Sequence, residues 1–174
     1  GVVKFALQYL SCIGTDSAVI DQFWTNVGYF NSLKDLGSAD TLIIDRVCAY
    51  AEALRRHKFS DYAAKVDMPR ISTEYEYGEL TSRKSSREIT EVRNQLDKQH
   101  YPSPAALNYV LSSNMLSVGI DINRLGLMTV YGQPKATAEY IQATSRVGRS
   151  NPGLVIVLLH MLRTRDKSHF EQFQ

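Results

Sequence analysis

The positions of apolar residues divide the chain into short strand-like runs and longer segments with helical spacing. Apolar runs at residues 109–112, 127–131 and 154–159 have the length and composition of strands that are covered on both faces of a sheet. Residues 23–30 and 71–80 are rich in aromatic and β-branched side chains, which also favour strands. The pattern therefore predicts five short strands.

Helices are predicted between these strands. A short helix with a Ser cap and a closing Gly is expected at residues 31–37, and a second helix at residues 47–54 precedes a polar loop at residues 55–70. A capping box at residues 85–88 begins a third helix, and a fourth fits residues 136–147. Strands that alternate with helices at this spacing imply βαβ units and a mainly parallel sheet. The predicted fold class is therefore α/β.

The composition is that of one ordinary globular domain spanning residues 1–174. The chain has 174 residues, of which 44% are hydrophobic and 22% charged, and its net charge of +2 is too small to indicate nucleic-acid binding by itself. Cys12 and Cys48 lack the spacing of a zinc site or a disulfide framework, so no metal site is predicted and a reducing cytoplasm is the expected location. No targeting or membrane-spanning segment is predicted. Because the chain begins with Gly, we expect it to be a piece of a longer polypeptide.

The segment at residues 140–149 carries the sharpest chemical signal. At about 100° per residue, Gln142, Arg146 and Arg149 would lie within roughly 60° on one face of a helix. Two guanidiniums that point the same way suit the oxygens of a phosphate group. The alternative is a solvated helix end, where arginine interacts favourably with the helix dipole.

This segment resembles motif VI of superfamily 2 helicases. The motif pattern Q-x-x-G-R-x-G-R is matched by Gln142, Arg146, Gly148 and Arg149, with Ser145 where the family often has Gly. The resemblance implies that Arg146 and Arg149 act as arginine fingers on the terminal phosphate of ATP. It also implies that Gln142 couples the nucleotide to a partner domain.

Residues 111–121 resemble motif V of the same superfamily, a strand followed by a turn that ends in Gly-hydrophobic-Asp. The resemblance implies that small polar residues after the strand contact nucleic-acid phosphates, and that the Gly and the Asp face the nucleotide. The first group is Ser112, Ser113 and Asn114, and the second is Gly119 and Asp121. An ordinary strand and turn with an N-cap at Asp121 is the alternative.

A third segment, at residues 78–87, places hydroxyl groups and cations between a strand end and a helix start. Free amides at a helix N-terminus bind anions, and the side chains of Thr81, Ser82 and Arg83 would add to that site. We therefore expect a clamp for the nucleic-acid backbone. A capped helix with solvated basic side chains is the simpler alternative.

Three strings together resemble the helicase-like proteins of bacterial DISARM anti-phage systems. They are residues 28–37, 78–87 and 163–170, and the matched pieces run from about residue 23 to residue 173. The family resemblance implies a RecA-like domain that works in defence against phage.

The chain lacks two features that ATP hydrolysis requires. It has no G-x-x-x-x-G-K-[ST] loop for the phosphates and no acidic pair after a strand for magnesium. The resemblance implies that ATP and Mg²⁺ are held mainly by an N-terminal RecA-like domain of the same polypeptide. The chain itself would be the second RecA-like domain of an ATP-dependent helicase or translocase, inactive alone, acting on nucleic acid, with DNA preferred over RNA.

Two other functions remain open from the residues. A degenerate RecA-like fold could serve as a non-catalytic nucleic-acid-binding or scaffold module in a defence or repair complex. A nuclease or other hydrolase is disfavoured, because no carboxylates or histidines cluster with metal-ligand spacing.

Overall fold

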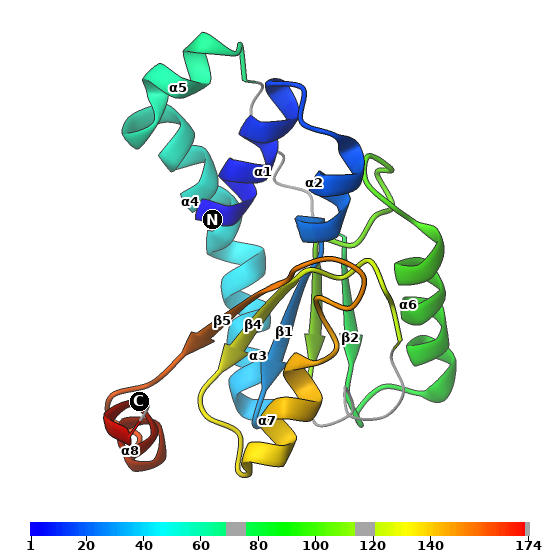
Figure 1. Cartoon of the computed structure of the whole chain (residues 1–174), viewed down its shortest axis with the longest axis vertical. Coiled ribbons are helices and arrows are strands. Elements are labelled where there is room, and N and C mark those ends of the chain that lie inside the picture. Colours follow the sequence, from blue (N-terminus) through cyan, green and yellow to red (C-terminus); the bar gives the residue numbers. More distant parts are fainter. Residues whose placement is uncertain (69–75, 114–120, 173–174) are drawn as a thin grey trace.

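A five-stranded sheet forms the centre of the protein, seen here in a computed structural model that describes residues 1–68, 76–113 and 121–172 (Figure 1). The strands are β1 Asn26–Phe30, β2 Tyr77–Leu80, β3 Tyr109–Ser112, β4 Leu127–Tyr131 and β5 Leu154–Leu158. Their order is β2-β3-β1-β4-β5, and every neighbouring pair is parallel. The predicted α/β class and parallel sheet are confirmed.

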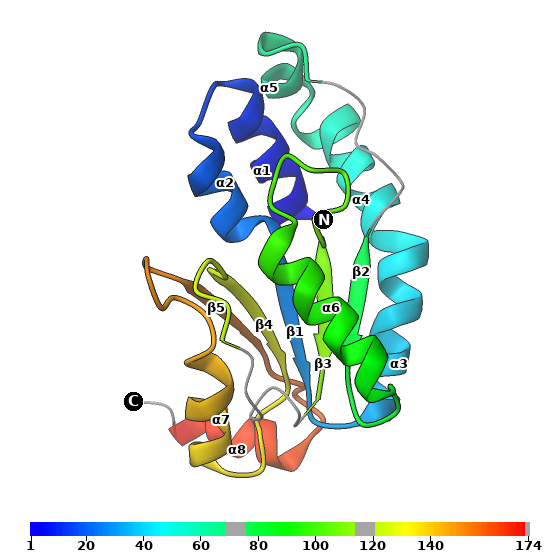
Figure 2. The same ribbon diagram turned by 90° about the vertical axis from the view of Figure 1, so that its right-hand side faces the viewer.

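Helices cover the sheet on both faces. Helices α6 Ser86–Lys98 and α7 Thr137–Thr144 lie on one face and α3 Leu33–Leu42 on the other, as Figure 2 shows. The larger core lies between the sheet and α6 and α7. Its most deeply buried side chains are Val27, Tyr29, Leu80, Leu96, Leu107, Val110, Met128 and Val130. Among the described residues, no helix is long and apolar enough to cross a membrane.

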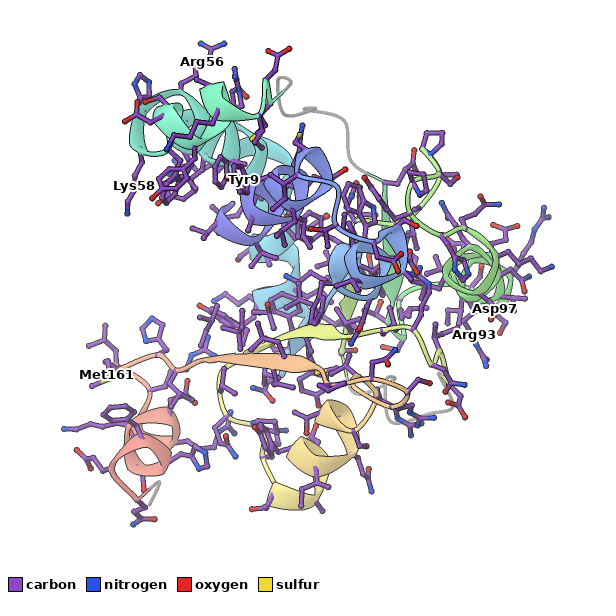
Figure 3. All side chains as sticks on the ribbon, turned by 45° about the horizontal axis from the view of Figure 1, so that its top comes forward. Tyr9, Arg56, Lys58, Arg93, Asp97 and Met161 are labelled. Carbon is purple, nitrogen blue, oxygen red and sulfur yellow. The ribbon has the colours of Figure 1, made fainter. Side chains whose placement is uncertain are left out.

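A second, smaller apolar cluster lies beyond the end of the sheet where the strands begin (Figure 1). It joins α1 Val2–Cys12 to a run of helical segments that continues directly from α3. These segments are η1 Ile43–Val47, α4 Cys48–Ala53, η2 Leu54–Lys58 and α5 Ser60–Lys65. The predicted polar loop at residues 55–70 is therefore wrong where η2 and α5 form. Those helices form because Phe59, which lies between them, stacks on Phe5 of α1, and Tyr62 of α5 contacts Tyr9 of α1 edge-on (Figure 3 labels Tyr9).

Two predicted boundaries near β1 are also corrected. Phe23 and Trp24 belong to helix α2 Ser17–Trp24, whose first turn is capped by the Asp16 carboxylate accepting from the Ala18 N–H at 2.9 Å. Helix α3 continues through Gly37 instead of ending there. The predicted strand at residues 71–80 is confirmed only for its last four residues, and residues 71–75 lie outside the described part of the chain.

The capping box predicted at residues 85–88 is confirmed. Ser85 Oγ accepts from the Glu88 N–H at 3.3 Å, and the Glu88 carboxylate accepts from the Ser85 N–H at 2.8 Å. The Ser85 hydroxyl also donates to the Glu88 carboxylate at 2.7 Å. This hydrogen bond, the one from the Ser85 N–H and the neighbouring Lys84 lower the pKa of Glu88 to about 2. The start of α6, directly after β2, is thereby fixed.

A buried ion pair ties α2 and the end of α6 to the turn before β4. The Arg124 guanidinium contacts the Asp21 carboxylate at 3.2 Å and donates to the carbonyls of Leu96 at 3.0 Å and Gln99 at 3.3 Å. The Asp21 carboxylate also accepts from the Tyr101 N–H at 2.6 Å. Burial lowers the pKa of Arg124, while the charge of Asp21 acts in the opposite direction.

Candidate functional site

The sequence-predicted site residues fall into two clusters at opposite ends of the sheet. The first lies where β2 and β3 end. Leu80 is in register with Ser112, so Thr81 and Ser113 follow neighbouring strand ends. This places residues 81–83 and residues 112–113 together, as expected for segments that leave adjacent parallel strands. Asn114 lies outside the described residues.

Two of the predicted phosphate contacts in this first cluster are buried. Thr81 is fully buried and its hydroxyl donates to the Glu79 carboxylate. Ser112 is also fully buried and donates to the Gly28 carbonyl at 3.0 Å. The structure leaves the side chains of Ser82 and Arg83 exposed, and Ser113 half-buried. Of the residues predicted to contact phosphate in this cluster, Arg83 therefore presents a charged group to solvent.

Glu79, which the sequence analysis did not single out, holds Arg83 in place. Arg83 donates through Nε to Glu79 Oε1 and through Nη2 to Oε2, the latter at 2.7 Å. The Glu79 side chain is 7% exposed, and that of Arg83 is 42% exposed. Burial raises the pKa of Glu79, but the hydrogen bonds from Arg83 and Thr81 and the charge of Arg83 together bring that pKa below its ordinary value. Glu79 is therefore an ionised carboxylate at neutral pH.

The second cluster lies at the other end of the sheet, where β4 and β5 begin. Helix α7 starts beyond the end of β4 and runs back along the sheet, so residues 145–149 lie beside the start of β4. The Gly148 N–H donates to the Leu125 carbonyl at 2.8 Å, two residues before β4. This segment therefore lies at the opposite end of the sheet from the residues that follow β2 and β3, because α7 spans the sheet before the arginines appear.

The helix itself is shorter than predicted. It ends at Thr144, and Arg146 and Val147 continue in tighter turns whose N–H groups donate to carbonyls three residues earlier. Gly148 then adopts a φ of +74°, and a Cβ there would meet the backbone of Gly153 at 3.0 Å. Both constraints require glycine, so Arg149 does not continue the face of α7.

The ends of the two helicase-like motifs meet in this second cluster. Arg149 Nη1 donates to the Asp121 carboxylate, and Arg149 Nε donates to the Ser145 carbonyl at 3.2 Å. Arg146 is half-buried, and Gln142 is exposed on α7. The structure thus brings Asp121 and Arg149 together, while Gly119 lies outside the described residues.

One buried contact anchors α7 to the sheet. The Tyr29 hydroxyl on β1 donates to the Glu139 carboxylate on α7 at 2.5 Å. Burial, followed by the hydrogen bond and charge of Glu139, raises the pKa of Tyr29. This contact sets where α7 starts, and hence where the arginines at its far end lie.

Two of the DISARM-like strings meet beyond the ends of β1 and β4. Arg163 donates to the Asp35 carboxylate at 2.6 Å, and Asp166, a buried residue of the otherwise mostly exposed helix α8 Thr164–Gln172, ties that helix to the segment after β4. The Asp166 carboxylate is 1% exposed and accepts from the N–H groups of Gln133 at 3.0 Å and His160 at 2.9 Å. Residues 28–37 and 163–170 therefore form one structural unit.

The sheet, the helices that flank it and the two motif ends define the class of protein. Residues 41–151 match the helicase conserved C-terminal domain, and the chain belongs to this family. Within it, the chain is 44% identical over 159 residues to the DISARM protein DrmA of Bacillus paralicheniformis. That match covers 91% of this chain and 13% of DrmA, so the chain corresponds to a small part of its relative. The resemblance to DISARM proteins is confirmed.

Solved structures support the fold. S. cerevisiae Dbp5 bound to RNA and ADP BeF3 aligns with a TM-score of 0.54 and 14% identity, over 98% of this chain and 35% of that chain. The C-terminal part of the Fun30 ATPase domain aligns with a TM-score of 0.55 and 12% identity, over 92% of this chain and 43% of that chain. The predicted RecA-like fold is confirmed.

Proposed function

We propose that the chain is the second RecA-like domain of an ATP-dependent nucleic-acid motor of the DISARM type. The observation that carries this proposal is the meeting of Asp121 and Arg149 within a chain of the helicase C-terminal family. These residues end the segments that resemble motifs V and VI. Their contact brings together one predicted nucleotide-facing residue from each motif, which supports the proposal.

The residues in this cluster fit a nucleotide phosphate. Arg149 uses Nη1 and Nε on Asp121 and Ser145, which leaves N–H groups of Nη1 and Nη2 for an anion. Asp121 is exposed, so its ion pair with Arg149 is weak and can be exchanged for a stronger anion. When bound, ATP with Mg²⁺, held mainly by an N-terminal RecA-like domain, would supply the terminal phosphoryl group, which passes to water with ADP as the leaving group. Arg149 and Arg146 would then stabilise negative charge and Gln142 would adjoin the nucleotide, while the role of Gly119, outside the described residues, stays a prediction.

The cluster at the ends of β2 and β3 is proposed to hold the nucleic-acid backbone. Arg83 and Ser82 are exposed there, and Ser113 lies on the neighbouring strand end. Contacts to phosphate are independent of sequence, as a motor that moves along a strand requires. We propose DNA as the substrate; Dbp5, a fold relative, is bound to RNA in its structure.

Replacing Arg149 tests the motor. In the full-length protein, Arg149→Ala should lower nucleic-acid-stimulated ATP turnover by about 10³-fold or more, as removal of an arginine finger does. Arg149→Lys keeps the charge but loses the planar fork, so it should restore little. Thermal stability should change by no more than about 1 kcal/mol, because the ion pair with Asp121 is exposed.

Arg165→Ala on α8 is the matched control. Arg165 is exposed and lies in neither cluster, so its removal should leave turnover unchanged. Normal turnover in both Arg149 variants, with the fold intact, would instead support a non-catalytic binding or scaffold module.

A further inference from the structure

We propose that Glu79 is a positioning residue that fixes the Arg83 guanidinium so that its outward N–H groups face a nucleic-acid phosphate. The proposal rests on the proposed function of the strand-end cluster. It assigns a role to a residue that carries the opposite charge to the one expected in a site for an anion.

The geometry of the pair defines which donors remain. A guanidinium has five N–H donors, and Glu79 takes the one on Nε and one on Nη2. The edge formed by Nη1 and the second N–H of Nη2 points away from Glu79. That edge has the fork geometry that binds two phosphate oxygens at once.

Glu79 is itself held from a second side. The buried Thr81 hydroxyl donates to the same oxygen, Oε1, that accepts from Arg83 Nε. The carboxylate is on a strand and almost fully buried, so it cannot follow Arg83 if the arginine moves. Arg83 is therefore oriented by a rigid element.

Neighbouring cations at this end of the sheet are paired differently. Lys84 contacts Glu88 at 3.2 Å and Arg87 contacts Glu91 at 2.9 Å, and both of these carboxylates are exposed on α6. Such pairs are loose and are screened by salt. Of these three cations, Arg83 is the one that a buried carboxylate orients.

Orientation lowers the cost of binding. Ordering a long flexible side chain at an interface costs about 0.5–1.5 kcal/mol, which corresponds to between about twofold and tenfold in affinity. Glu79 makes that ordering part of folding. Without it, Arg83 would have to be ordered when the nucleic acid binds.

The substitution Glu79→Gln separates positioning from simple electrostatics by the sign of its effect. Removing a negative charge beside a phosphate site should tighten binding if charge alone matters. If Glu79 positions Arg83, binding should instead weaken by about twofold to tenfold. The measurement is the affinity of the full-length protein for a labelled oligothymidylate, at several salt concentrations.

Glu91→Gln is the matched control. It removes the same charge from an exposed pair on α6, so binding should stay unchanged or tighten slightly. Glu79→Asp keeps the charge but shortens the side chain, and it should weaken binding as Glu79→Gln does. Thermal melting shows whether each variant is folded, and Glu79→Asp serves if Glu79→Gln does not fold.

Arg83→Ala distinguishes failure of this inference from failure of the proposed function. It should weaken binding to all sequences and lower the salt dependence by about one phosphate contact. If Arg83→Ala weakens binding but folded Glu79→Gln binds as well as the original protein or better, the positioning role is overturned. If Arg83→Ala has no effect, the strand-end grip itself is overturned.

Discussion

Replacing Arg124 with Met should destabilise the protein severely, and more than replacing its partner Asp21 with Asn. The side chains of Arg124 and Asp21 are 11% and 9% exposed, so neither charge can be solvated if the other is removed. The two residues join α2, the end of α6 and the turn before β4. Their loss would therefore act on three elements at once.

The size of each effect follows from the partners that remain. With Arg124 gone, the Asp21 carboxylate keeps the Tyr101 N–H and a contact to the half-exposed His100 at 3.5 Å. Leaving a buried charge in this state costs about 3–5 kcal/mol. With Asp21→Asn, the guanidinium keeps the carbonyls of Leu96 and Gln99, so the cost should be about 1–3 kcal/mol.

Urea unfolding of the original protein, Arg124→Met and Asp21→Asn measures these free energies. The comparison requires that the free energy of unfolding depends on urea concentration with the same slope in all three proteins. The matched control is Arg87→Met, because Arg87 is 89% exposed and its pair should contribute less than about 0.5 kcal/mol. A loss below about 1 kcal/mol for Arg124→Met would refute the reasoning. An equal loss of stability in Asp21→Asn would refute it as well, because the guanidinium left in Asp21→Asn keeps carbonyl partners that the carboxylate left in Arg124→Met does not have.

The chain alone should release no phosphate from ATP, and turnover that survives repeated purification would show that it holds a complete nucleotide site. Ser85→Ala should raise the pKa of Glu88 from about 2 toward its ordinary value, as measured by NMR titration, with Ser86→Ala as control. Because the pKa of Glu88 is lowered in the folded protein, the stabilisation by Glu88 is present above its ordinary pKa of 4.5 and is lost as the pH falls toward 2. An unchanged titration of Glu88 in Ser85→Ala would show that the Ser85 hydroxyl does not lower this pKa. Asp166→Asn leaves one side-chain oxygen to accept from the N–H groups of Gln133 and His160, so amide hydrogen exchange in α8 should become faster. Exchange rates equal to those of the original protein would show that another contact holds the helix.

The strands were the part of the fold that the sequence predicted best. Residues 109–112 and 127–131 match β3 and β4, because strands covered on both faces of a parallel sheet must be apolar along their whole length. The helices η2 and α5 were missed for the converse reason. Their apolar partner, Phe5, lies far away in the sequence, so no local pattern could reveal it.

The motif resemblance identified Asp121 and Arg149, which are in contact in the structure. Helical periodicity, however, placed the end of the helix before Arg149 too late in the sequence. Helical periodicity extended α7 to Val147, whereas the turns after Thr144 and the left-handed Gly148 end it earlier. Gly148, which follows Val147 and precedes Arg149, was an available signal for that end. The contact between Asp121 and Arg149 required the three-dimensional path of α7.

The strand-end cluster shows why the sequence pattern could not distinguish its buried hydroxyl groups from its exposed donors. Thr81 and Arg83 both suit a phosphate, and a sequence pattern cannot tell which donors are already used inside the fold. Glu79 decides this, because it accepts hydrogen bonds from the Thr81 hydroxyl and from two N–H groups of Arg83. An acidic residue in an apolar strand, four residues before an arginine, was the signal in the sequence. Since a buried carboxylate requires a charged partner, that spacing indicates an oriented guanidinium at the strand end and not a loose group of polar side chains.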